Sequence, residues 1–197
     1  MDTAPSANRK QLTHDRILDT AARVLRKSGF GGVGVADIMK RVGLTHGGFY
    51  AHFASRDALL AEALVRAGQD SQARLQRSLA TAGARSHSDF RALVEGYLAD
   101  RHLESPESGC PVAALASGLP RQSDAVRAAG AARIASLVAA VQDVLPPGGS
   151  AEIAGIVASQ LVGALQIARA LGHNAGGQRH LPPSRKVLLG QIDAPRR

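Results

Sequence analysis

Apolar residues recur three and four positions apart along most of the chain, and no segment alternates apolar and polar side chains in the manner of a strand. Glycine, proline or a capping hydroxyl separates the apolar stretches from one another. The pattern predicts helices over residues 11–28, 35–42, 45–53, 55–79, 88–98, 110–117, 123–145, 151–171 and 184–192. We therefore expect an all-α fold preceded by a disordered arm over residues 1–10.

Residues 35–53 predict two short helices joined by a tight corner. The apolar face of the first helix consists of Val35, Ile38, Met39 and Val42. Gly43 follows where the chain must reverse, and Thr45 can cap the second helix through its hydroxyl. Phe49 and Phe53 lie four positions apart and can anchor that helix to the first. The side chains left over are His46, Gly47, Gly48, Tyr50 and His52. An apolar back and a small, hydrogen-bonding front are typical of a helix-turn-helix that holds its second helix in a DNA groove.

The charge of the chain favours a polyanionic partner such as DNA. The 197 residues carry a formal net charge of +8. Residues 1–60 hold 9 Lys and Arg against 5 Asp and Glu, so half of the net charge lies in less than a third of the chain. No apolar run approaches the roughly 20 residues of a membrane span, the N-terminus has no apolar signal-peptide core, and Cys110 is alone. We expect a soluble, cytoplasmic protein without a membrane partner.

Residues 11–65 resemble the N-terminal DNA-binding domain of the TetR family of bacterial transcriptional regulators. The resemblance is carried, in chain order, by Ile17-Leu18-x-x-Ala21-Ala22, Gly29-Phe30, Val35-x-x-Ile38, Val42-Gly43-Leu44, Gly47-x-x-Tyr50-x-His52-Phe53 and Ser55-Arg56-x-x-Leu59-Leu60. It implies an N-terminal three-helix helix-turn-helix DNA-binding domain over residues 11–56, with the motif at about 34–53. It also implies a C-terminal helical ligand-binding and dimerisation domain over residues 57–197.

The same resemblance implies a function and a set of DNA contacts. Such a protein binds a pseudo-palindromic operator in double-stranded DNA as a homodimer, and leaves it when a ligand enters the C-terminal domain. The residues expected at base edges are His46, Gly47 and Gly48, and those expected at phosphates are Thr45, Tyr50, His52 and Arg56. The chain departs from the family pattern at His46, where Lys is frequent, and at Gly34, where a capping hydroxyl is frequent. We expect a ligand-responsive regulator, in the first instance a repressor, and not an enzyme.

Two features of the C-terminal domain are candidate sites of control. An apolar pocket for an unknown small-molecule inducer is expected from Phe90, Leu93, Tyr97, Leu115, Ile134 and Leu137. Helix 151–171 carries Gly155, Ser159 and Gly163 at four-residue steps and is apolar on two sides. Because both sides must be covered, we expect one to face its own domain and the other a second subunit. A central helix inside one large domain is the alternative.

Cys110 precedes Pro111, a residue suited to the first turn of a helix. A cysteine at such a cap faces unpaired backbone N–H groups and the positive end of the helix dipole, which makes its thiol more nucleophilic. The pattern therefore allows a sensor thiol that reacts with electrophiles or oxidants. The simpler interpretation, which we prefer, is a small residue buried in a core.

Two other functions stay open on the sequence alone. One is a helix-turn-helix protein that senses no small molecule and is controlled by a protein partner. The other is an enzyme that depends on Cys110, which needs a base and an orienting group that the sequence does not place at recognisable spacing. The histidines have no metal-ligand spacing, and the glycine pattern from Gly29 to Gly34 follows a helix rather than a strand. We therefore expect no metal and no cofactor.

Overall fold

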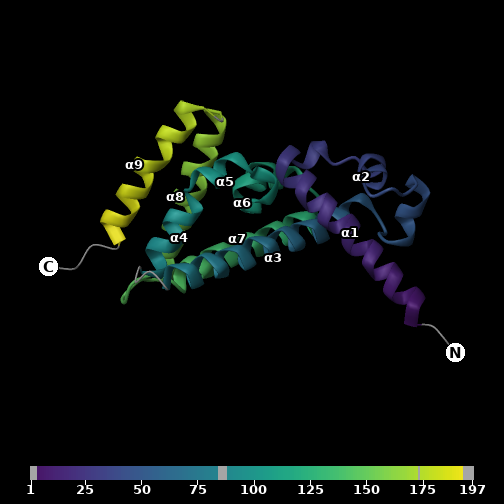
Figure 1. Cartoon of the computed structure of the whole chain (residues 1–197), viewed down its shortest axis with the longest axis horizontal. Helices are drawn as coiled ribbons and strands as arrows, with labels where there is room; N and C mark the ends of the chain where they lie inside the picture. Colours follow the sequence, from purple (N-terminus) through teal and green to yellow (C-terminus); the bar gives the residue numbers. More distant parts are fainter. Residues whose placement is uncertain (1–3, 84–87, 173, 193–197) are drawn as a thin grey trace.

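A computed structural model shows helices arranged along one long helix, α3 (Figure 1). It describes residues 4–83, 88–172 and 174–192, and within these ranges every regular element is helical. The α-helices are α1 (Ala4–Ser28), α2 (Val35–Arg41), α3 (Arg56–Gly83), α4 (Asp89–Tyr97), α5 (Asp100–Glu104), α6 (Pro111–Leu115), α7 (Asp124–Gln142), α8 (Ala151–Ala170) and α9 (Ala175–Ile192). Short 3-10 helices are η1 (Phe30–Gly32), η2 (His46–Ala51), η3 (Pro106–Ser108) and η4 (Ala116–Arg121).

Helix α3 takes part in two hydrophobic cores. Its first half is crossed by α1, with α2 and η2 beyond the crossing, and these elements share the N-terminal core (Figure 1). Its second half packs against α4 and α7; α8 packs on α7, and α9 on α8, around the C-terminal core. The sequence pattern predicts the inner face of α3 correctly, because Leu59, Leu60, Ala63, Leu64 and Ala67 are all buried. One rigid rod thus connects the two halves of the molecule.

Three serines begin helices as their positions predict. The Ser55 hydroxyl accepts from the Ala58 N–H at 3.1 Å, that of Ser88 from the Arg91 N–H at 3.2 Å, and that of Ser150 from the Ile153 N–H at 3.4 Å. The predicted cap at Thr45 is wrong, since its side chain makes no capping bond. The Gly48 N–H donates instead to the backbone carbonyl of Thr45 at 3.1 Å, so the donor that the hydroxyl would have served is already satisfied.

Two helices are longer than the sequence pattern predicts. Helix α1 begins at Ala4, so residues 4–10 are helical where a disordered arm was expected; residues 1–3 lie outside the described residues. Helix α9 begins at Ala175 and continues through Pro182 and Pro183, although each proline removes a backbone donor. Burial of Leu181 and Leu188 in the C-terminal core outweighs that loss.

Helix α8 is long and apolar enough to cross a membrane by length and composition alone, contrary to the expectation from sequence that no run is. Contacts with the rest of the protein indicate that α8 is a helix of the folded core. Arg169, in its last turn, donates from Nη2 to the carbonyl oxygen of His102 at 2.8 Å, which ties α8 to α5. Ala154, Val157 and Leu161 are buried in the C-terminal core. About a third of the helix is buried.

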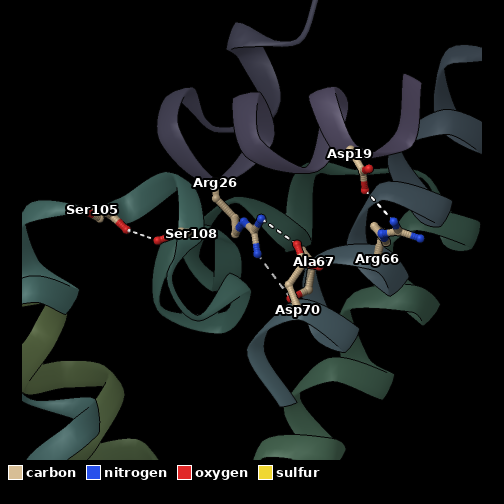
Figure 2. A network of polar contacts seen from close by, with 7 residues as sticks. All are labelled: Asp19, Arg26, Arg66, Ala67, Asp70, Ser105 and Ser108. Carbon is tan, nitrogen blue, oxygen red and sulfur yellow. Dashed lines mark hydrogen bonds and ion pairs between the residues drawn. The ribbon is translucent and has the colours of Figure 1, made fainter. Parts of the chain in front are cut away.

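A buried arginine joins α1 to α3 (Figure 2). Arg26 is only 4% exposed, and its Nη2 lies 3.0 Å from Asp70 Oδ2 while its Nη1 donates to the carbonyl oxygen of Ala67 at 3.3 Å. Asp19 and Arg66 form a second bridge between the same two helices at 2.7 Å, with both side chains partly exposed. The two pairs have the same chemistry but differ in burial, which makes them a matched comparison.

We expect Asp70→Asn to lower the free energy of unfolding by about 2 kcal/mol, because it leaves the buried Arg26 guanidinium without a counter-charge. Asp19→Asn, at the more exposed pair, should cost less than about 1 kcal/mol. Urea unfolding followed by circular dichroism measures both values. Equal losses for the two variants would show that the burial of Arg26 contributes nothing to its pairing.

Candidate DNA-binding surface and ligand cavity

The corner between α2 and η2 depends on Gly43. Its φ is 73°, a left-handed conformation that a side chain would strain. This turn lets the Gly43 N–H donate to the Lys40 carbonyl at 3.0 Å, and the Leu44 N–H to the Met39 carbonyl at 2.9 Å. The carbonyls at the end of α2 are thereby satisfied within three residues, and the chain leaves in a new direction.

The second element of the motif is the 3-10 helix η2, not the α-helix that the spacing predicts. Two adjacent glycines, Gly47 and Gly48, disfavour an α-helix here by about 1 kcal/mol each relative to alanine. The anchoring residues are correct, however. Phe49 and Phe53 are buried in the N-terminal core, and their stacked rings lie 5.6 Å apart between centroids. Burial of these rings therefore positions η2 although its backbone is intrinsically weak.

One edge of η2 is open to solvent. Thr45, His46 and Gly47 are exposed, and a Cβ added at Gly47 would meet no atom within 4 Å. Tyr50 is 69% exposed, although an aromatic ring of that size is normally covered. Gly48 is half-buried, and a Cβ added there would be in ordinary contact with Thr45 and Met39. These residues form a small polar edge with one prominent ring, which we call the η2 edge.

The other two predicted phosphate contacts, Arg56 and His52, lie in different surroundings. Arg56 donates from Nη2 to the Phe30 carbonyl and from Nε to the Val33 carbonyl at 3.1 Å, so it holds η1 against the start of α3. His52 is half-buried, and its pKa is lowered first by burial and then by the positive charges of His14 and Lys10. A neutral imidazole can still donate one hydrogen bond to a phosphate. Both contacts stay predictions.

Sequence reasoning missed His14, which supports the η2 edge from α1. Its ring stacks on Phe53 with 4.5 Å between ring centroids, and its Nε2 lies 3.0 Å from Glu62 Oε2 on α3. The contacts join residues far apart in the sequence, so no local spacing could indicate them. His14 therefore packs Phe53, which follows η2, against α1 and contacts α3 through Glu62.

A cavity of about 470 Å³ lies between α3, α4, α7 and the segment from α5 to α6. Of the residues expected to line a pocket, Leu93, Tyr97 and Leu137 do so, and Cys110 joins them. Phe90 is instead buried in the C-terminal core, and Leu115 in the N-terminal core. Ile134 is 40% exposed, because α7 is apolar around most of its circumference and its sequence does not indicate which face turns inward.

The cavity is also more polar than the sequence suggests. Arg74, Arg101 and Arg133 contribute to its wall together with serines of α3, η3 and α7, such as Ser71, Ser108 and Ser136. Burial, and then the charge of Arg26, lowers the pKa of Arg74. These arginines come from three different helices, so only the assembled fold brings them together.

His102 organises the part of the cavity next to Cys110. Its Nδ1 lies 2.6 Å from the Tyr97 carbonyl oxygen, and its Nε2 accepts from the Cys110 N–H at 2.9 Å. Nδ1 must therefore carry the proton, and burial lowers the pKa of His102 to about 4. Because Nε2 is already occupied by the amide, His102 is not placed to accept a proton from the Cys110 thiol. This removes the nearest candidate base for a cysteine-dependent reaction.

Tyr97 lies on the other side of Cys110. Burial first, and then proximity to the Cys110 thiol, raises the pKa of Tyr97 well above its usual value, so the phenol is neutral. Its hydroxyl oxygen is buried beside the Cys110 thiol, a weak hydrogen-bonding group, and has no oxygen or nitrogen partner among the described residues. A buried hydroxyl without a partner is costly unless a ligand or water completes it.

A tight glycine corner, a buried phenylalanine pair and an open polar edge define a helix-turn-helix DNA-binding domain. Residues 17–63 match the model of a family described as bacterial regulatory proteins, tetR family. No curated protein matches the chain.

Solved structures extend the likeness to the whole fold. A TetR-family transcriptional regulator from Agrobacterium tumefaciens is 23% identical, over 93% of this chain and 98% of that one, with a TM-score of 0.71. A TetR transcriptional regulator from Chloroflexus aurantiacus is 21% identical, over 94% and 96%, with a TM-score of 0.72. The reduced form of NemR from E. coli is 20% identical, over 89% and 96%, with a TM-score of 0.69. The N-terminal domain therefore belongs to the tetR family, and the whole chain has the fold of TetR-family transcriptional regulators.

We expect Tyr50→Ala to weaken DNA binding about tenfold, because a hydrogen bond from the hydroxyl to a charged phosphate is lost. The loss should be similar for related duplexes, since phosphate contacts do not read sequence. Fluorescence anisotropy with a duplex selected from a random library measures it. Thermal stability should not change, because Tyr50 is exposed, and Val65→Ala on the exposed side of α3 serves as the control. An unchanged affinity would remove Tyr50 from the DNA interface.

Proposed function

We propose that this protein is a transcriptional repressor that binds a pseudo-palindromic operator as a homodimer and leaves it when a small-molecule inducer fills the cavity. The observation that carries the proposal is the position of α6. Cys110, Pro111 and Val112, at its start, line the cavity. Leu115, at its end, is buried in the N-terminal core beneath the DNA-binding domain. The short helix α6 thus lines the cavity at its start and is buried in the N-terminal core at its end.

Close packing allows a displacement of α6 to reach the DNA-binding domain. Helix η4 continues directly from α6, and a Cβ added at Gly118 would come within 2.9 Å of the Phe30 ring in η1. Phe30 in turn holds Arg56 through its carbonyl oxygen. Because packed interiors have few voids, a shift at one end of this chain of contacts moves the other end.

Dimer geometry converts such a movement into release. Two recognition elements on one duplex must lie about one helical turn, roughly 34 Å, apart. An inducer that favours the wrong spacing by about 1–3 kcal/mol lowers operator affinity by roughly 5- to 150-fold. The expected coupling therefore needs only a modest difference in the inducer's affinity for the two states.

The proposed dimer contact is the outer face of α8. Ile156 is 60% exposed there, and Ile167 is exposed on the same helix. A Cβ added at Gly155 or Gly163 would meet nothing within 4 Å, so the small-residue stripe is open in one subunit. The Ser159 hydroxyl donates a hydrogen bond to the Gly155 carbonyl oxygen of its own helix at 2.9 Å, so this side chain does not project from the small-residue stripe. Exposed apolar side chains beside small residues suit a helix from a second copy.

We expect the double variant Gly155→Leu, Gly163→Leu to be a folded monomer that binds operator at least about 100-fold more weakly, since one DNA-binding domain then acts alone. Light scattering at micromolar protein gives the oligomeric state, and anisotropy gives the DNA affinity. Ala128→Leu, on the exposed side of α7, is the matched control. A monomeric wild type, or a dimeric double variant, would contradict the α8 interface.

A second route to induction is covalent, through Cys110. Cys110 is the N-cap residue of α6 with Pro111 following, as the sequence predicts. It is buried from bulk solvent but lines the cavity, so an electrophile has to enter the cavity to reach it. Addition of the thiol to a quinone would break the S–H bond and a ring C=C π bond, and would form a carbon–sulfur bond at the start of α6. The thiol proton passes to the quinone, which becomes a hydroquinone thioether, so no other oxidant or reductant is needed. A role in packing alone, which we prefer from the sequence, fits the 4% exposure of Cys110 and is what this covalent route is tested against.

We expect Cys110→Ser to keep its operator affinity but to resist release by a benzoquinone, whereas the wild type is released. Mass spectrometry should find one adduct on the wild type and none on the variant. Release of the variant at wild-type quinone concentrations would leave Cys110 as a core residue only. Control by a protein partner, without any small molecule, would be favoured if neither quinones nor other cavity ligands shift the melting temperature.

A further inference from the structure

The charges around the cavity are unbalanced. Arg74, Arg101 and Arg133 line it, whereas Asp143 is the acidic residue in its described wall. None of the three arginines forms an ion pair within the described part of the chain. Asp70, the nearest acidic group to Arg74 on α3, is already held by the buried Arg26 at 3.0 Å. The described wall of this cavity therefore carries more positive than negative charge.

Arg133 lies across the surface of α3 at Gly68. A Cβ added at Gly68 would come within 2.5 Å of Arg133 Cδ and 2.6 Å of its Nη1. Glycine in the interior of a long helix is unfavourable, and here it provides the space in which the guanidinium lies. Both residues line the cavity. The backbone of α3 is thus shaped to admit an arginine side chain from α7.

Hydrogen-bond donors in this region also lack acceptors. Arg133 Nε is buried and has no partner among the described residues, and the buried Tyr97 hydroxyl has only the Cys110 thiol, a weak partner, close to it. Unpaired buried donors are costly, and charged ones most of all. Partial burial, and then the positive charge of Arg26, lowers the pKa of Arg74. An acceptor that carries negative charge would relieve each of these costs.

One part of the wall is apolar. Leu75, Leu93, Val112, Leu137 and Ala140 line the cavity beside the polar groups. A wholly polar anion such as inorganic phosphate would leave these side chains without contacts, and a neutral hydrocarbon would leave the arginines unpaired. The lining therefore matches a molecule with one charged end and an apolar body.

We propose that the cavity binds an amphipathic organic anion, whose carboxylate pairs with Arg133 and the neighbouring arginines and whose apolar body lies against Leu93, Val112 and Leu137. The inference rests on the proposed function only in regarding this cavity as the inducer site. The match between the positive cavity wall and an anionic ligand does not depend on DNA binding.

The test compares decanoate, decanol and decylamine, which share one chain and differ in the charge of the head group. Isothermal titration calorimetry on the full-length protein without DNA, below the aggregation concentration of each probe, measures the affinities. Decanoate should bind at least about tenfold more tightly than decanol, and decylamine most weakly. Equal binding of the three probes, preference for decylamine or no binding of decanoate would overturn the proposal.

Two variants of different kinds locate the carboxylate. Arg133→Gln should reduce decanoate affinity about tenfold and leave decanol unchanged. Gly68→Ala should weaken decanoate binding without removing any charge, because the new Cβ displaces Arg133. Arg127→Gln, on the same helix as Arg133 but paired with Asp124 at 2.7 Å on an exposed face, should have no effect. Unchanged decanoate affinity in both Arg133→Gln and Gly68→Ala would overturn the assignment.

Operator release distinguishes this inference from the proposed function. If decanoate binds through Arg133 but does not release DNA, the proposed anionic ligand class is supported and inducible repression through this cavity is contradicted. If other molecules release DNA while decanoate fails to bind, the proposed repressor function is supported and the proposed anionic ligand is contradicted.

Discussion

Burial of helix α3 on different faces along its length is the constraint on which the rest of this structure depends. Its first turns carry a continuous apolar face from Leu59 to Ala67 that α1 and the helix-turn-helix must cover. Its later turns carry Leu75 and polar residues that face α4 and α7 around the cavity. One continuous helix therefore belongs to both regions, and the burial that stabilises each region also holds the DNA-binding domain and the cavity wall on the same element.

Positions without a side chain set how closely the elements approach. Gly43 allows the reversal that presents η2, and Gly118 allows the Phe30 ring to pack on η4. Gly68 gives the Arg133 side chain its place on α3. In each case a Cβ would either strain the backbone or collide with a neighbour. These glycines link the DNA-binding surface, the packing beneath it and the cavity through contacts that larger residues would prevent.

The N-terminal domain was predictable because its information is local. The spacing of Ile38, Met39, Phe49 and Phe53 fixes which sides of two short elements are apolar, and Gly43 marks the corner between them. Short elements with narrow apolar faces can pack in few ways. The same argument failed for the conformation of η2, since the glycine pair weakens the α-helix and the spacing of two phenylalanines does not distinguish it from a 3-10 helix.

The cavity was predictable only in part, for a different physical reason. Helix α7 is apolar around most of its circumference, so periodicity did not show that Leu137 faces inward while Ile134 faces solvent. Leu115 belongs to the N-terminal core because of where α6 crosses between the two cores. Local spacing of apolar residues was enough to identify an all-helical chain with a DNA-binding motif near its start. The convergence of arginines from α3, α5 and α7 on one cavity came from long-range packing, which brings together residues that share no pattern along the chain.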